Sequence, residues 1–141
     1  MKTVIEKEVA IAELGDLVNK YVKKHVRTPA TNDDLEKGYP DVLDAIMDGF
    51  LSFNAEGLPV FKLSSPIKSQ EGNVVLDEVT FKTRIKPLTL ADLAKGLHPQ
   101  NEVFTLQLRM TSYIIGQPVA MLDKFSAYDY DVISQVGSIF S

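Results

Sequence analysis

The spacing of apolar residues changes along the chain from a helical period to an alternating one and back, which limits the possible folds. In residues 6–26 and 40–53 apolar side chains recur every three or four positions, as on one face of an α-helix. In residues 74–85 they alternate with polar ones, as in a strand with one face in water. From Pro87 onward the helical spacing returns. This pattern predicts a mostly helical α+β fold: N-terminal helices, a two-stranded antiparallel β-hairpin, then three to four C-terminal helices.

The predicted hairpin joins a short strand, 60–63, to the strand 74–85. Gly72 and Asn73 lie between them, and both residue types tolerate the positive φ of tight turns. The apolar face of the longer strand is expected to carry Val75, Val79, Phe81 and Ile85. Two strands alone are marginally stable, so helices or another subunit must cover this face.

Start and stop signals divide the C-terminal region into helices. Thr89 to Asp92 matches a capping box, and Gly96 ends the short helix that it opens. A longer helix is predicted for 101–115, with an apolar stripe of Val103, Leu106, Met110 and Ile114 and a stop at Gly116. A helical turn at 118–125 and a last helix opened by a second capping box, Ser126 to Asp129, follow. We place the main boundary near 54–59, between an N-terminal helical segment, 1–56, and a hairpin-plus-helices part, 57–141.

Composition narrows the functional classes. The 141 residues are 45% hydrophobic and 24% charged, which is ordinary for a globular protein. The absence of cysteine excludes disulfides, thiolate metal sites and a cysteine nucleophile. Charged residues interrupt every apolar stretch short of the roughly 20 residues that span a membrane, and residues 1–8 lack a signal-peptide core. We therefore expect no membrane association and a location in the cytoplasm where the chain is made. The net charge of −4 weighs against nucleic-acid binding.

No arrangement of residues predicts catalysis, a cofactor or a metal. His25 and His98 have no carboxylate or second histidine at metal-ligand spacing. Asp123, Asp129 and Asp131 are close in sequence but do not fit a calcium-binding loop, and helix-start acids on a solvated face explain them. Asn32 to Asp34 is expected to cap a helix. We predict that the chain is not an enzyme.

Three groups of cations leave alternatives open. The first group lies at the end of the first predicted helix, where it either complements the helix dipole or contacts a phosphate. It consists of Lys20, Lys23, Lys24, His25 and Arg27. Arg109 is either exposed beside its helix stripe or an ion-pair partner at a subunit interface. Lys82, Arg84 and Lys86 give the hairpin a positive edge that discourages aggregation, or that docks an acidic partner.

The C-terminal part, over about residues 59–141, resembles a known family. The order begins with a hairpin segment at 61–67, a turn and a segment at 77–81. A helix bounded by proline follows at 88–93, then the segment 122–130 and an apolar C-terminal helix. This order is similar to that of the tail assembly chaperones of contractile-tailed, Mu-like and P2-like phages. The positions that match the family motifs are Leu63, Pro66, Ile67, Gly72, Leu122, Phe125, Ser126 and Asp129.

The resemblance implies a non-catalytic helper without cofactor. Such proteins bind the long, aggregation-prone tape measure protein during tail assembly in the host bacterial cytoplasm and are absent from the mature virion. A structural minor tail or connector protein retained in the virion is the alternative. A helix-turn-helix regulator built from helices 6–26 and 40–53 is the less favoured one, given the acidic charge balance.

Two helix faces are candidates for contact with a partner or with a second copy of the chain. They consist of Val42, Ile46 and Phe50 on helix 40–53 and Val132, Val136, Ile139 and Phe140 on the last helix. The alternative is that both faces form the core. Two wide apolar helix faces and a hairpin with one apolar face are more apolar surface than one small core needs to bury, so we expect a homo-oligomer.

Overall fold

The computed structural model describes residues 5–82, 85–98 and 100–140. The N-terminal helices are α1 (Lys7–Tyr21), α2 (Lys23–Arg27), α3 (Asn32–Gly38) and α4 (Pro40–Met47). The strands are β1 (Leu51–Phe53), β2 (Pro59–Lys68) and β3 (Val74–Thr80), and the C-terminal helices are α5 (Pro87–Leu93), α6 (Val103–Ile115), α7 (Val119–Leu122) and α8 (Ala127–Phe140). The prediction of a mostly helical α+β chain is confirmed.

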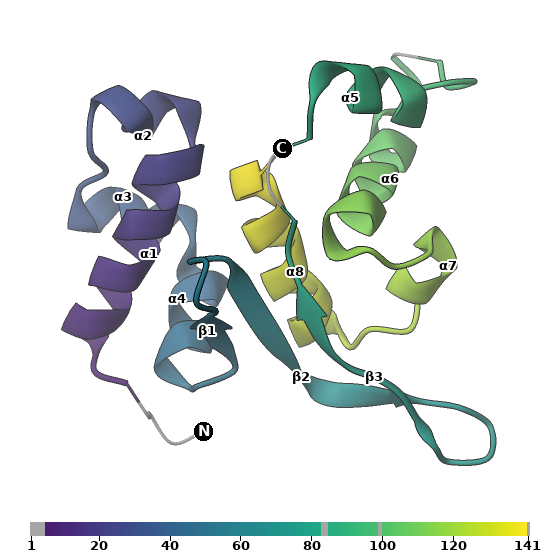
Figure 1. Cartoon of the computed structure of the whole chain (residues 1–141), viewed down its shortest axis with the longest axis horizontal. Coiled ribbons are helices and arrows are strands. Elements are labelled where there is room, and N and C mark those ends of the chain that lie inside the picture. The colour runs from purple at the N-terminus through teal and green to yellow at the C-terminus, as the bar shows by residue number, and fades with distance from the viewer. Residues whose placement is uncertain (1–4, 83–84, 99, 141) are drawn as a thin grey trace.

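Helix α8 lies in the middle of the molecule. Figure 1 shows α1 to α4 on one side of it and α5 to α7 on the other, with the sheet beside it. It contacts α1, α4, α6 and β2. The last helix of the sequence therefore joins the two halves of the fold.

The sheet has three antiparallel strands in the order β1-β2-β3, so the prediction of a two-stranded hairpin is corrected. The added strand comes from the end of the predicted helix 40–53. Gly49 adopts a φ of +83°, which only glycine takes up readily, and it ends α4 early. The amides of Gly49 and Phe50 donate to carbonyls of the last turn, and Leu51 then pairs with Phe61.

The predicted first helix, 6–26, is two helices. The chain leaves the helical conformation at Val22, which has a ψ of 116°, and α2 starts again at Lys23. Helix α3 has a full capping box, but its cap is Thr31, one residue before the expected Asn32. The hydrogen bonds of the Thr31 amide and hydroxyl with the Asp34 carboxylate hold the pKa of that carboxyl below its ordinary value.

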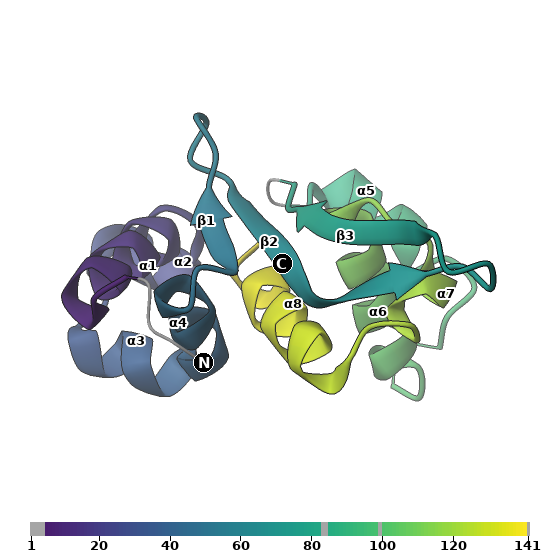
Figure 2. The same cartoon turned by 90° about the horizontal axis from the view of Figure 1, so that it is seen from below.

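Strand β2 is longer than the predicted strand 60–63, and β3 is shorter than the predicted strand 74–85. Val79, Phe81 and Ile85 are buried as expected, but Val75 is 53% exposed. Figures 1 and 2 explain the difference: the tip of the β2–β3 hairpin projects beyond the helices, so no helix covers it. The pairing of β2 with β3 is also irregular between Lys62 and Ile67.

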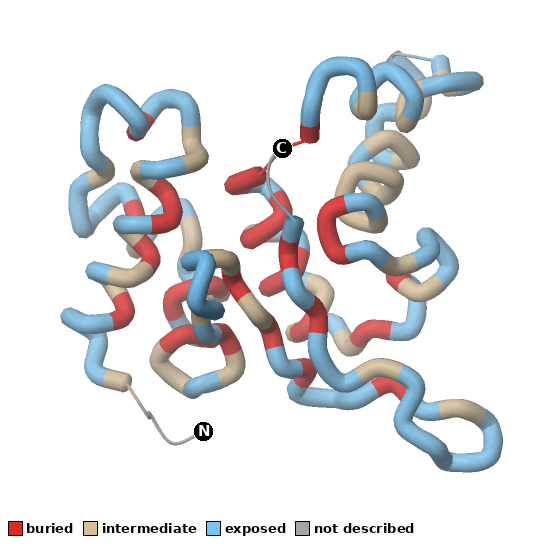
Figure 3. Tube along the Cα trace, in the orientation of Figure 1, coloured by how far each residue is buried: buried red, intermediate tan, exposed pale blue. Residues whose placement is uncertain are grey.

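One continuous core crosses the predicted boundary near residues 54–59. Buried side chains of α1, α4, β2, β3 and α8 belong to a single cluster. Figure 3 shows this buried zone running through the centre of the molecule, whereas most of α5 and the hairpin tip are exposed and most of α6 is intermediate. The ring centroids of Tyr21 and Phe140 lie 4.8 Å apart, so the first and last long helices touch directly. The boundary itself lies in the β1–β2 turn of one sheet.

The C-terminal helices follow their predicted positions with small shifts. Helix α5 begins at Pro87, and Lys86 is its N-cap. Thr89 lies inside the helix, so the capping box expected to start there is not used. Helix α6 ends at Gly116, whose φ of +69° is left-handed. No helix in the part of the chain that the structure describes is both long and apolar enough to cross a bilayer.

Candidate functional site

The predicted association face lies in the interior of the chain, so that prediction is wrong for six of its seven residues. Five of them are completely buried and the sixth, Ile139, is 1% exposed; the six are Val42, Ile46, Val132, Val136, Ile139 and Phe140. Their burial follows from the packing of α4 against α8. The seventh, Phe50, is half-buried beyond the end of α4, with its ring centroid 6.2 Å from that of Tyr128. The core alternative holds, and the argument for a homo-oligomer from surplus apolar faces loses its basis.

Most of the family-like motif residues are buried, and Asp129 among them is a buried carboxylate. Leu63, Ile67, Leu122 and Phe125 are buried, whereas Pro66 is exposed and Gly72 takes the turn conformation with a φ of +87°. Asp129, in the first turn of α8, has no exposed surface. Asp129 of the second motif contacts Ser64 and Ser65 within the segment of the first, so the two segments meet where α8 contacts β2.

Asp129 fixes α8 to the sheet. One carboxylate oxygen accepts hydrogen bonds from the Ser64 amide at 3.0 Å and the Ser64 hydroxyl at 2.8 Å. The other accepts from the Ser65 amide at 3.1 Å. Its own amide donates to the Ser126 hydroxyl at 3.1 Å, so half of the predicted capping box is present, while the carboxylate serves the tertiary contact. The sequence shows both segments as motifs but does not predict this contact between them.

Tyr128 sits next to this carboxylate with its hydroxyl buried and without a hydrogen-bond partner in the described part of the chain. Burial, together with the negative charges of Asp48, Asp44, Asp129 and Asp41, raises its pKa to about 12. Both effects disfavour the phenolate, because burial removes its hydration and the carboxylates repel it.

Tyr128 is predicted to weaken the fold at alkaline pH. Between pH 10 and about 12 an unfolded chain loses the phenol proton, which the folded chain keeps. Since the native state then binds more protons, the free energy of unfolding falls as pH rises through this window. Tyr128→Phe should raise stability at pH 8 by up to about 1 kcal/mol, because it removes an unpaired buried hydroxyl. It should also reduce the loss of melting temperature between pH 10 and 11. An equal alkaline loss in both proteins would contradict the assignment.

Arg109 holds the end of α5 instead of pairing with an acid. Its Nη1 donates to the carbonyl of Leu93, the last residue of α5, at 2.9 Å and to that of Lys95, two residues further on, at 3.0 Å. Carbonyls at a helix C-terminus carry partial negative charge, so a guanidinium suits them. Neither alternative left open by the sequence, an exposed stem or an interface ion pair, includes this role.

The histidines and carboxylates form no reactive group. His25 is buried with Nδ1 3.0 Å from the Thr28 carbonyl, and Nδ1 of His98 lies 3.3 Å from the amides of Gln100 and Asn101. Asp123 and Asp131 are exposed, while Asp129 is buried. Within the described ranges no three His, Asp or Glu side chains are placed to hold a metal ion.

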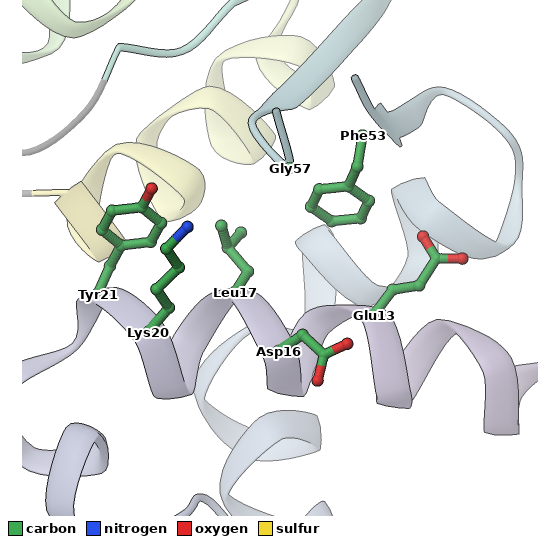
Figure 4. Close-up of a pocket in the computed structure, with 7 residues that line it drawn as sticks. All are labelled: Glu13, Asp16, Leu17, Lys20, Tyr21, Phe53 and Gly57. Carbon is green, nitrogen blue, oxygen red and sulfur yellow. The ribbon is translucent and has the colours of Figure 1, made fainter. Parts of the chain in front are cut away.

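A hollow of about 390 Å³ separates α1 from the turn after β1. Figure 4 shows Leu17 and Phe53 facing into it, with Glu13 beside Phe53. At its other end the Lys20 ammonium lies 5.3 Å from the centroid of the Tyr21 ring. Acidic and basic groups thus both border it, and it has no set of convergent polar groups that would select one ligand.

The strongest candidate site is an open apolar surface on the C-terminal helices. Ten large apolar side chains of the described residues are exposed, and six of them lie between residues 88 and 119. We call these six the open apolar surface: Leu88, Leu90, Val103, Phe104, Tyr113 and Val119. The sequence predicted an apolar stripe on 101–115 but not whether other elements cover it, and Phe104 lies off that stripe.

A groove between α6 and α8 adjoins this surface. It encloses about 260 Å³ and is lined by uncharged residues: Phe104, Gln107, Met110, Thr111 and Ile114 on α6, and Tyr130, Ser134, Gly137 and Ser138 on α8. The α6 residues recur every three or four positions, so they form one helix face. Small side chains on α8 leave the groove open.

No family model, no curated protein and no solved structure matches this chain.

Proposed function

We propose that the chain is a non-catalytic assembly chaperone that binds an apolar helix of a long partner polypeptide. The sequence resemblance suggests the partner, the tape measure protein of a phage tail, and the setting, tail assembly in the host bacterial cytoplasm without retention in the virion. The open apolar surface is the observation that supports a protein-binding role.

This surface is unusual for a chain that has a large core of its own. Twenty-five apolar residues are buried in one cluster, so the chain has buried its α4 and α8 faces and still exposes Leu88 and Phe104. Phe104 is 66% exposed. Large apolar side chains that a folded protein leaves exposed are candidates for contact with a partner.

The groove beside Phe104 suits a helix. Two antiparallel or parallel helices present a furrow into which the apolar side chains of a third helix can pack at positions three and four apart. One wall of the groove contains the small residues Ser134, Gly137 and Ser138, which allow the backbone of a bound helix to approach closely. Because no charged residue lines the groove, an uncharged helix face fits it best. A tape measure chain exposes such faces before the tail tube surrounds it.

Phe104→Asp should weaken partner binding about tenfold, since an exposed aromatic at the centre of a contact contributes more than 1 kcal/mol. The folded state should change little, because Phe104 is in the first turn of α6, where an aspartate favours the helix dipole. Val9→Asp is the matched control. It replaces an apolar residue that is 51% exposed, also in the first turn of a helix, but on α1. Co-expression with the tape measure protein, followed by affinity purification, measures both variants.

The proposal predicts that the wild-type chain and Val9→Asp keep the partner soluble and co-purify with it, and that Phe104→Asp does not. A partner that stays insoluble with the wild-type chain would contradict the chaperone function. Equal recovery with all three proteins would place the contact elsewhere on the chain. Finding the chain in purified particles would instead favour the virion component.

A further inference from the structure

A second hollow, on another side of α6, carries positive charge. It encloses about 470 Å³ between the end of β3, α5, α6 and α7. Its walls are partly apolar, with Leu93, Pro118 and Val119, and Tyr113 stands beside them. We call it the basic hollow, because the charged residues among its described lining are Lys82 and Arg109.

Both cations are held in place by uncharged groups. The Lys82 amide donates to the Ile114 carbonyl at 2.8 Å, and the Lys82 ammonium lies 5.0 Å from the centroid of the Tyr113 ring. Arg109 is oriented by its two carbonyl acceptors at the end of α5. Within residues 5–82, 85–98 and 100–140, neither cation has a carboxylate within 4.0 Å. The hollow thus presents two oriented positive charges without a counter-charge, on a chain whose net charge is −4.

The loop after α6 borders the hollow. Gly116 has a left-handed backbone, and a Cβ at this position would lie 3.6 Å from Cε of Lys82. That distance is an ordinary van der Waals contact, so the glycine is required by the left-handed turn, and the Lys82 side chain lies beside this turn. Val119, which is 43% exposed, borders the same space and belongs to the open apolar surface.

We propose that the basic hollow binds an acidic and apolar helical segment of the partner polypeptide. A Glu or Asp carboxylate would lie between Lys82 and Arg109, and a neighbouring apolar side chain would pack on Leu93 and Val119. The identity of the partner rests on the proposed function, whereas the chemistry of the segment rests on the charges and walls of the hollow. Charge complementarity of this kind sets the orientation of a bound helix and its rate of association.

The hollow favours a different protein over a second copy of this chain. The chain's own exposed helical acids near an exposed apolar residue include Glu8 beside Val9 on α1 and Asp92 four residues after Leu88 on α5. Neither pair lines the hollow, so a second copy would have to dock through a different patch. A contact between two different patches of the same chain is heterologous and tends to build open-ended assemblies. The apolar walls likewise suit a peptide better than a free anion.

The test uses a defined probe, an 18-residue helical peptide with leucine and glutamate on one face, and a matched peptide with lysine in place of glutamate. NMR titration of the labelled full-length chain locates the binding. We expect the acidic peptide to shift the amides of Gly116 and Val119 and the ring of Tyr113. Lys82→Glu should weaken its binding roughly fivefold and Lys82→Gln less, since exposed charge pairs contribute modestly. Lys62→Glu, an exposed lysine on β2, is the control.

The outcomes separate this inference from the proposed function. Three results would each overturn the proposed binding at the basic hollow, even if the tape measure protein co-purifies. They are equal binding of both peptides, no shift at the hollow, and equal weakening by Lys82→Glu and Lys62→Glu. Shifts that instead follow protein concentration without peptide would assign the hollow to a second copy and also overturn it. Specific binding of the acidic peptide together with failed co-purification would leave the hollow and remove the tape measure assignment.

Discussion

Phe140→Ala should lower the free energy of unfolding by about 4 kcal/mol, the usual cost of removing a buried phenylalanine. The ring is fully buried, 4.8 Å from the Tyr21 ring and 6.4 Å from the Phe81 ring between centroids. It therefore packs α8 against α1 and against Phe81 just after β3, and its loss would leave a cavity in the core. A loss of this size is a large share of the roughly 5–15 kcal/mol that stabilises a domain.

Urea denaturation followed by circular dichroism measures this loss, and Leu88→Ala provides the control. Leu88 is 83% exposed, so its replacement should change stability by less than about 0.5 kcal/mol. If Phe140 instead formed a partner-binding face, its replacement would reduce binding and leave stability nearly unchanged. The same reasoning predicts that deletion of residues 126–141 unfolds the chain, so such a truncation cannot test partner binding.

Asp129→Ala should lower the free energy of unfolding by about 2–3 kcal/mol. It leaves the amides of Ser64 and Ser65 and the Ser64 hydroxyl without their acceptor at a partly buried junction. Buried donors that lose a charged acceptor cost more than ordinary hydrogen bonds contribute. The carboxylate also lies in the first turn of α8, where the helix dipole favours a negative charge.

Two further variants distinguish this contact from a general effect of charge. Asp131→Ala removes an exposed carboxylate from the same helix and should have little effect on the melting temperature. Asp129→Asn keeps one acceptor oxygen but turns an amide N–H₂ toward a donor, so we expect roughly half of the loss seen with alanine. If Asp129→Ala and Asp131→Ala melted at the same temperature, the contact with β2 would not stabilise the fold.

Local signals in the sequence predicted the elements whose ends depend on local chemistry. Gly116 ends α6 because a left-handed residue is needed there, and Ser126 opens α8 with a hydroxyl that accepts from the Asp129 amide. The boundary of α4 was missed because Gly49 lay inside a convincing apolar stripe. Its left-handed conformation turns the chain into β1, so α4 ends at Met47, six residues before the predicted end of the helix at residue 53.

Contacts between distant segments could not be predicted from one sequence. The apolar stripes of α4 and α8 were recognised, but a stripe does not say whether it faces another helix of the same chain or a partner. The structure packs these two against each other and leaves most of α6 only partly buried. The partner of Asp129 is 65 residues away, so only the fold reveals that its carboxylate serves β2.

Amide hydrogen exchange of the chain, alone and with the tape measure protein, tests whether this proposed partner binds the open apolar surface. We expect slower exchange on binding in residues 88–93 and 103–113, which carry most of that surface, and little change in residues 132–140, most of which are buried in the core. Slower exchange confined to α1–α4, with residues 88–113 unchanged in the complex, would contradict this expectation.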